Sequence, residues 1–168
     1  TFLLDKEIDT GEIIMQEKVS IDKDETAGTL HDKLMLLGNK VVVETIKIIE
    51  KGKVHSQSQD AIIQRDKLQL KPAPKIFKDD CKIDWNKDAK SVYNFIRGLS
   101  PYPAAHTQFV SEDGETLDFK IYDVSLEERL SDDYELNQVI TDGKSYMKVV
   151  LKDYYISINV LQQAGKKA

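Results

Sequence analysis

Two stretches of the chain carry apolar residues at the spacing of an amphipathic helix that buries one side. The first follows Thr26, a suitable N-cap, and stops at Gly52, a residue type that commonly ends helices. The second follows Asn86, another suitable N-cap, and stops near Gly98 and Pro101. The apolar positions are Leu30, Leu34, Leu37, Val41 and Ile48 in the first stretch and Ala89, Val92, Tyr93, Ile96 and Leu99 in the second. We therefore predict one long helix and one shorter helix.

Gly38 lies in the middle of the long predicted helix. A glycine there costs about 1 kcal/mol relative to alanine. A bend or a close packing contact at this position would explain its presence.

Shorter apolar runs that roughly alternate with polar residues predict strands. Residues 2–4 and 12–21 form two such runs around the loop at residues 5–11, and one face of the second run is expected to be buried. After Pro103 the runs are separated by Asp113-Gly114 and Asp142-Gly143, two strong hairpin signals. The strands predicted in this region are 106–110, 116–124, 137–140, 145–151 and 154–161. Five antiparallel strands with one helix suggest a small closed or partly open barrel such as an OB-fold, which can bind oligonucleotides but does not prove that function.

Residues 53–73 are polar and weakly patterned, with a short apolar island at residues 61–63. We expect a linker there, with room for one short strand. Pro72 and Pro74 then remove two backbone donors and stiffen the chain towards polyproline II. We therefore predict that residues 71–82 form a semi-rigid strap between two folded bodies. The lysines of this strap are Lys71, Lys75, Lys78 and Lys82.

The composition argues against several classes of protein. No apolar run approaches the roughly 20 residues that span a bilayer. Cys81 is the only cysteine, which rules out an internal disulfide and fits a reducing compartment. The three histidines are far apart in the sequence, so we expect no metal site. The chain does not begin with Met, and we expect it to be a fragment of a longer protein.

The net charge of −5 argues at first sight against a nucleic-acid partner, but the charges are unevenly distributed. Residues 53–104 carry ten lysines and arginines against six acidic residues, and residues 137–168 carry five against two. Residues 105–136 carry two against ten. The basic regions offer candidate phosphate contacts, although a solvated surface is the simpler interpretation from charge alone. The candidates are Lys75, Lys78, Lys82, Arg97, Lys166 and Lys167.

Asp9 is the acidic residue with the most suggestive position. It lies in the turn Ile8-Asp9-Thr10-Gly11 between two apolar runs, where a glycine permits unusual backbone angles. A carboxylate held at the rim of a sheet can orient a histidine or a water molecule for proton transfer. Asp-X-Gly is also common in loops, where the aspartate only forms the turn. Both alternatives remain open from these residues alone.

Several segments, in the right order along the chain, resemble those of bacterial methionyl-tRNA formyltransferases. They are FLLDKEIDTGEII at 2–14, ETAGTLHDKL at 25–34, APKI at 73–76, IDW at 83–85 and NFIRGLSPYPAA at 94–105. The segment LQQAGKK at 161–167 is similar to the closing segment of the family. Together these segments span nearly the whole chain.

The resemblance implies an α/β fragment, the end of a Rossmann-like formyltransferase domain at residues 1–52. A linker at 53–74 and a mainly β, OB-fold-like barrel at 75–168 would follow it. The implied reaction transfers a formyl group from 10-formyltetrahydrofolate to the amino group of methionine on initiator tRNA. The implied partner is initiator methionyl-tRNA, contacted first by Lys75 and Lys78 and then by Lys166 and Lys167. The implied enzyme is cytoplasmic and monomeric, without a metal or a membrane.

The resemblance also gives Asp9 a catalytic role. In such enzymes an asparagine, a histidine and an aspartate act together, and the aspartate of the Asp-Thr-Gly loop matches Asp9. It would hold the histidine in its useful protonation state while the asparagine and histidine bind the developing oxyanion. We expect those two residues, and most of the folate pocket, upstream of this chain. We therefore expect the chain to be inactive alone.

Three features depart from the pattern of the family. The common Pro-Gly-Ala after the second helix is Pro103-Ala104-Ala105 here, which reduces the flexibility of the turn. Thr29 stands where a capping box at the start of the long helix usually has glutamate. The acidic segment 105–136 is unexpected in an RNA-binding domain, and we expect it to face away from the tRNA.

An alternative is a barrel that only scaffolds a formyltransferase acting on a small substrate. The sugar-nucleotide formyltransferases have similar Trp and Ile-Arg segments. The Ala-Pro-Lys-Ile strap and the Gly-Lys-Lys ending favour the tRNA-dependent enzyme.

Overall fold

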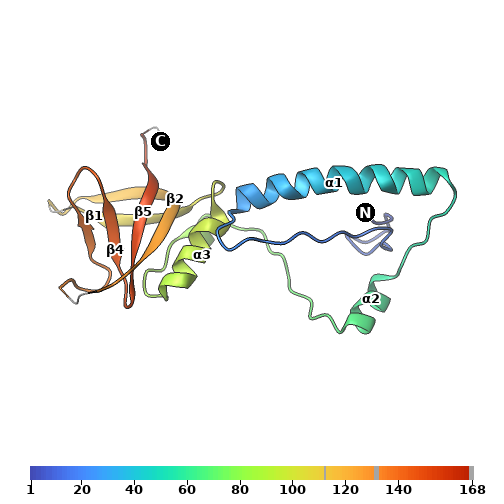
Figure 1. The fold of residues 1–168 in the computed structure, drawn as a ribbon, viewed down its shortest axis with the longest axis horizontal. Coiled ribbons are helices and arrows are strands. Elements are labelled where there is room, and N and C mark those ends of the chain that lie inside the picture. Colours follow the sequence, from blue (N-terminus) through green and yellow to red (C-terminus); the bar gives the residue numbers. More distant parts are fainter. Residues whose placement is uncertain (112, 131–132, 167–168) are drawn as a thin grey trace. The chain divides into compact units, whose positions relative to one another are not determined.

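The computed structural model describes residues 1–111, 113–130 and 133–166. The chain divides into two compact units (Figure 1). Unit 1 consists of Thr1–Asp22 and Leu30–Pro74, and unit 2 consists of Lys23–Thr29 and Lys75–Ala168. The first turn of the long helix α1 (Ala27–Glu50) therefore belongs to unit 2 and the remainder to unit 1.

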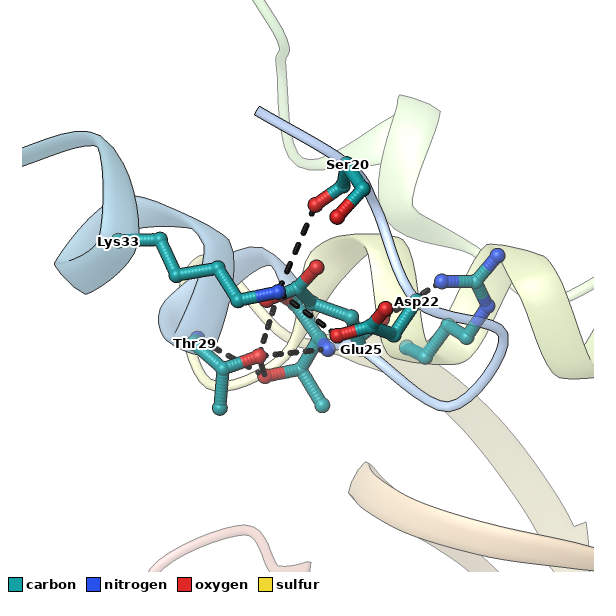
Figure 2. Close-up of polar contacts among 7 residues, drawn as sticks. Ser20, Asp22, Glu25, Thr29 and Lys33 are labelled. Carbon is teal, nitrogen blue, oxygen red and sulfur yellow. Dashed lines mark hydrogen bonds and ion pairs between the residues drawn. The ribbon is translucent and has the colours of Figure 1, made fainter. Parts of the chain in front are cut away.

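The ends of α1 are capped by the residues that the sequence predicts. Thr26 Oγ1 accepts a hydrogen bond from the Thr29 N–H at 3.2 Å, and Thr29 Oγ1 accepts one from the Thr26 N–H at 3.0 Å (Figure 2). This is a complete capping box in which threonine replaces glutamate, so the departure from the family pattern leaves both backbone donors bonded. At the other end, Gly52 adopts a φ of +62° and donates to the Ile49 carbonyl at 2.9 Å.

In unit 1, polar contacts hold α1 more than burial does. The Thr45 hydroxyl is buried and lies 2.8 Å from the Thr1 hydroxyl. Lys33 Nζ donates to the Asp22 carboxylate at 2.8 Å and to the Ser20 carbonyl at 3.5 Å (Figure 2). Four of the predicted apolar side chains are half-buried, namely Leu30, Leu37, Val41 and Ile48. The fifth, Leu34, is about half exposed. The predicted stripe therefore exists, but the described residues cover it only in part.

The two strands predicted in unit 1 are not formed, and that prediction was wrong. Residues 2–4 and 12–21 form no strand: one isolated bridge joins Phe2 to Ile13, and another joins Ile13 to Gln57. Each bridge consists of a single residue pair, so the backbone hydrogen bonds do not extend into a β-ladder. The expectation of a Rossmann-like fragment is therefore not confirmed.

The stretch that we expected to be a linker with room for a short strand contains a helix instead. α2 (Gln59–Asp66) begins after Ser58 and ends at Lys67, whose φ is +49°. The negative charge of Asp60 in its first turn and the positive charge of Arg65 in its last turn both interact favourably with the helix dipole. Only Ile62 is buried on this helix, so its apolar pattern was too weak to predict it.

Unit 2 is built from α3 (Ala89–Leu99) and a five-stranded antiparallel sheet. The strands are β1 (Ala105–Val110), β2 (Thr116–Glu128), β3 (Val139–Thr141), β4 (Met147–Val150) and β5 (Tyr154–Gln163). Their spatial order is β1-β2-β5-β4-β3. All five predicted strands are confirmed, although Glu112 of the first predicted turn lies outside the described residues. The sheet curls into a half-barrel, and register shifts between Ile121 and Val124 add to the bend of β2 (Figure 1).

The apolar stripe of α3 packs on this sheet as predicted. Its buried residues are Ala89, Val92, Ile96 and Leu99. The helix begins later than predicted, because its N-cap is Asp88 and not Asn86. The Asp88 carboxylate accepts from the Ser91 N–H at 2.9 Å. Asn86 instead bonds to the Asp84 carboxylate through its own backbone and side-chain N–H groups, both at 3.1 Å.

Trp85, three residues after the strap, fixes the chain to the sheet. Its indole N–H donates to Thr107 Oγ1 at 2.8 Å, and its ring lies 6.1 Å from that of Phe109. A short 3-10 helix, η1 (Asp79–Cys81), precedes it in the strap. Burial and then the nearby Asp80 raise the pKa of the Cys81 thiol, so this cysteine remains an unreactive thiol near neutral pH.

Residues 23–29 dock on the C-terminal half of α3. The Tyr93 hydroxyl donates to the Asp24 carboxylate at 3.2 Å, and burial together with this carboxylate raises the pKa of Tyr93. Arg97 donates from its guanidinium to the Glu25 carbonyl at 2.6 Å. Gly28 donates its N–H to the carbonyl at residue 100, also within unit 2, at 2.9 Å. These bonds fix the start of α1 within unit 2.

The two glycines of α1 give a direct test of this docking. A Cβ on Gly28 would lie 2.5 Å from Cδ of Pro101, whereas nothing lies within 4 Å of a Cβ on Gly38. Alanine gains about 1 kcal/mol of helix propensity over glycine in a helix interior. We therefore expect Gly38→Ala to raise the free energy of unfolding by about that amount and Gly28→Ala to lower it. Urea unfolding followed by far-UV circular dichroism measures both, and equal gains would contradict the steric argument.

The turn after α3 gives a second test. Ala104 has a φ of +72°, where a Cβ costs about 1–2 kcal/mol, whereas Ala105 has no such strain. Both side chains are buried, so Ala104→Gly and Ala105→Gly each remove one buried methyl group. We expect Ala104→Gly to be the more stable variant by about 1–2 kcal/mol. Urea unfolding followed by fluorescence of Trp85, the only tryptophan, would show the difference. Equal unfolding free energies would mean that Ala104 is not strained.

Candidate functional site

The loop at residues 5–11 in unit 1 is closed at its base by backbone pairing. The Leu3 N–H donates to the Glu12 carbonyl at 2.9 Å, beside the bridge from Phe2 to Ile13. A Cβ on Gly11 would lie only 1.5 Å from the Leu3 carbonyl oxygen. Gly11 is therefore required by a close approach of the backbone, and not by the unusual backbone angle that the sequence suggested.

The unusual backbone angle in this loop belongs to Asp9. Its φ is +60°, a left-handed conformation that aspartate tolerates better than most residues. The side chain is exposed. Within the part of the chain that the structure describes, its carboxylate forms no hydrogen bond or ion pair. It can therefore accept a hydrogen bond from a reacting group or from another side chain.

Gln59, the first residue of α2, holds the Asp9 loop from the side. Its Nε2 donates to the Asp9 carbonyl at 2.7 Å and to the Gly11 carbonyl at 2.8 Å. Sequence analysis missed this residue because it lies in a polar stretch whose pairing partner is about fifty residues away. Nothing in the sequence itself signals the contact.

In unit 2, a pocket of about 370 Å³ brings the strap next to the C-terminal segment. Lys78 lines it from the strap, Lys120 from β2 and Gly165 from the segment after β5. His106 lines it from β1 and donates from Nε2 to the Lys78 carbonyl at 2.9 Å. The remaining lining residues are Asp118, Phe119, Gln162, Gln163 and Ala164. Two lysines and two glutamine amides from three segments, the strap, β2 and β5, thus converge on one hollow.

Lys120 is the basic residue of this pocket that sequence analysis missed. In the sheet it pairs with His106 on one side and with Gln162 on the other. It lies in the acidic segment 105–136, so counting charges by segment hid it. Asp118 of the same segment also lines the pocket, and the expectation that this segment faces away from the tRNA stays a prediction. Its carboxylate accepts a hydrogen bond from Gln108 Nε2 at 2.9 Å.

The other predicted phosphate contacts have different surroundings. Lys75 and Lys82 are exposed, and Lys75 Nζ lies 5.6 Å from the centre of the Phe77 ring. Arg97 is half-buried and bonded within unit 2, to Glu25 and also to Asn94 Oδ1 at 2.8 Å. Lys166 is exposed next to Gly165, and its carbonyl accepts from Gln162 Nε2 at 2.8 Å. Lys167 lies outside the described residues.

The described residues offer no candidate metal site and no candidate membrane-spanning helix. Among the residues with described positions, no three histidine, cysteine, aspartate or glutamate side chains are grouped so as to hold a metal ion. No helix in the described ranges is both long enough and apolar enough to cross a membrane.

Comparison with known proteins gives consistent matches over both units. The family model for the C-terminal domain of formyl transferases matches residues 75–168, and the formyl transferase model matches residues 1–46. Proteins named methionyl-tRNA formyltransferase match 99% of the chain: at 47% identity in Phocaeicola vulgatus, 48% in Azobacteroides pseudotrichonymphae and 42% in Flavobacterium johnsoniae. The chain covers 51%, 51% and 50% of these relatives, about half their length.

These matches confirm the resemblance that the sequence motifs indicate. The matched family models cover the Asp9 loop in one case and the strap end, α3 and the whole sheet in the other. The chain belongs to the formyl transferase family.

Proposed function

We propose that the protein containing this chain transfers a formyl group from 10-formyltetrahydrofolate to the amino group of methionine on initiator tRNA. The observation that carries the proposal is the 42–48% identity, over 99% of this chain, to proteins named methionyl-tRNA formyltransferase. The alternative, a structural barrel of a sugar-nucleotide formyltransferase, is not favoured by these relatives. The folate is a co-substrate in this proposal.

We propose the finer organisation as well. Residues 1–52 would complete a Rossmann-like catalytic domain, residues 53–74 would connect it, and residues 75–168 would form an OB-fold-like tRNA-binding domain in a cytoplasmic, monomeric enzyme. The curled sheet of unit 2 supports the barrel-like part. The match of the C-terminal model to residues 75–168 supports the position of that domain.

In the proposed reaction, the methionine amino group attacks the formyl carbon, and the bond between that carbon and the folate nitrogen breaks. Negative charge develops on the formyl oxygen, and the attacking amine must lose a proton. Asp9 would orient the catalytic histidine of the complete enzyme and stabilise its useful protonation state. The exposed carboxylate on a tightly closed loop supports this role, because it leaves the oxygens accessible while the backbone is fixed.

The proposed tRNA contacts are Lys75, Lys78, Lys82, Arg97, Lys166 and Lys167, and we add Lys120. The pocket supports Lys78 and Lys120 most strongly, since both line it together with amides that can donate to phosphate oxygens. Arg97 is the least supported of the proposed tRNA contacts, because its guanidinium already donates a hydrogen bond to the Glu25 carbonyl.

Binding of labelled initiator tRNA to the chain across a salt series tests the interface. Each phosphate contact contributes about 0.9 to the slope of log K against log salt on duplex nucleic acid. The Lys75→Ala/Lys78→Ala double variant should therefore bind more weakly, with a slope reduced by up to about two. Fluorescence anisotropy measures both quantities.

The matched control is Lys87→Ala/Lys90→Ala, which removes the same charge at the start of α3. It should leave the slope nearly unchanged. An identical loss in both double variants would show that only the overall charge matters, and an unchanged slope in the first would leave its lysines as solvated surface.

Asp9→Asn in the complete enzyme tests the catalytic role. Asparagine tolerates a positive φ as aspartate does, so the loop should retain its shape. We expect kcat to fall by roughly 100-fold or more, with the dissociation constant for tRNA unchanged. Asp5→Asn, in the same loop with the same change of charge, is the control and should keep its kcat. Wild-type turnover in Asp9→Asn would remove this residue from the mechanism.

A further inference from the structure

We propose that Gln59 is a positioning residue for Asp9: its side-chain amide fixes the backbone turn that presents the Asp9 carboxylate. The inference rests on the proposed function, in which Asp9 orients a catalytic group. It assigns a role in that reaction to α2, a helix that carries no catalytic side chain itself.

The geometry of the amide is specific. Its two N–H groups donate to carbonyls on either side of Thr10, those of Asp9 at 2.7 Å and Gly11 at 2.8 Å. Both partners can only accept hydrogen bonds, so only one orientation of the Gln59 amide satisfies them. A single side chain thus holds the residues before and after the centre of the turn.

The position of Gln59 is itself fixed by the residues just before it. The backbone N–H and carbonyl of Gln57 both bond to Ile13 at 2.9 Å. Ile62, one turn further along α2, is buried. The amide is therefore held beside the loop before any substrate binds, which is the arrangement that a preorganised site requires.

The loop has few other internal constraints near Asp9. The Thr10 hydroxyl donates to the Glu7 carbonyl at 3.2 Å, a long bond at an exposed position. The left-handed φ of Asp9 lies in a narrow allowed region and must be maintained by its surroundings. Without Gln59, water can bond to the two freed carbonyls, so the fold loses little while the carboxylate becomes less well positioned.

The test is steady-state kinetics of the complete enzyme with Gln59→Ala, Gln59→Met, Asp9→Asn and the double variant Gln59→Ala/Asp9→Asn. Met keeps most of the Gln59 side-chain volume without its donors. We expect both Gln59 variants to lower kcat by about 10-fold or more, since a misplacement of about 1 Å can cost up to 100-fold. KM for the tRNA should change by less than about 3-fold, because neither Gln59 nor Asp9 is among the proposed tRNA contacts.

The decisive result is the double variant. If Gln59 acts through Asp9, Gln59→Ala should have no further effect once Asp9 is asparagine. Multiplying effects, or wild-type kcat in Gln59→Met, would overturn the inference while the proposed function stands. Wild-type kcat in Asp9→Asn would instead overturn the catalytic role of Asp9 on which the inference rests.

Ser56→Ala is the matched control, because it removes a side-chain hydrogen bond between the same two segments without touching the Asp9 loop. We expect its kcat to stay within about 2-fold of wild type and the melting temperatures of all variants to agree within a few degrees. A loss in Ser56→Ala as large as that in Gln59→Met would mean that general loosening of the segments, and not the amide, sets the rate.

Discussion

Ile96 on α3, Ile121 on β2 and Ile156 on β5 are completely removed from solvent where the helix packs on the curled sheet, and unit 2 depends on this packing. Burying one such side chain contributes about 1.5–3 kcal/mol, more than a typical hydrogen bond between neutral groups. The packing fixes both β1, which follows α3 after a short turn, and the strap, which Trp85 joins to β1. The basic pocket forms where these segments meet β2 and the end of β5, so the hydrophobic core determines which cations converge.

Unit 1 is organised by a different principle. Its described residues bury few side chains, and its local geometry follows from hydrogen bonds between distant segments. Gln59 and Gln57 join residues 9–13 to the start of α2, and Gly11 allows the backbone of Leu3 to approach. Such bonds contribute little net stability at exposed positions, but they are directional and can define the shape of a loop. This is why the Asp9 carboxylate can be accessible and yet be held on a defined backbone.

The sequence predicted the elements whose apolar pattern is strong and missed those that depend on distant partners. The stripe of α3 and the strands around Asp142-Gly143 follow from local periodicity and turn chemistry, and both are confirmed. The cap at Asp88 was misplaced by two residues because Asn86 and Asp88 are both suitable caps, and only the bond from Asn86 to Asp84 decides between them. α2 and the role of Gln59 could not be predicted, since one buried residue gives no periodicity and a contact across fifty residues leaves no local signal.

The same limit applies to the charge argument. A net charge of −5 describes the whole chain, whereas a phosphate group responds mainly to charges within the screening length of about 8 Å at physiological salt. Among the described residues that line the pocket, Lys78 and Lys120 are accompanied by one carboxylate, that of Asp118, which already accepts a hydrogen bond from Gln108. The acidic residues elsewhere are screened from a ligand there, although they still repel a polyanion at low salt. A chain with an excess of acid can therefore present a local site for phosphate, but only through a fold that gathers lysines from segments far apart in the sequence.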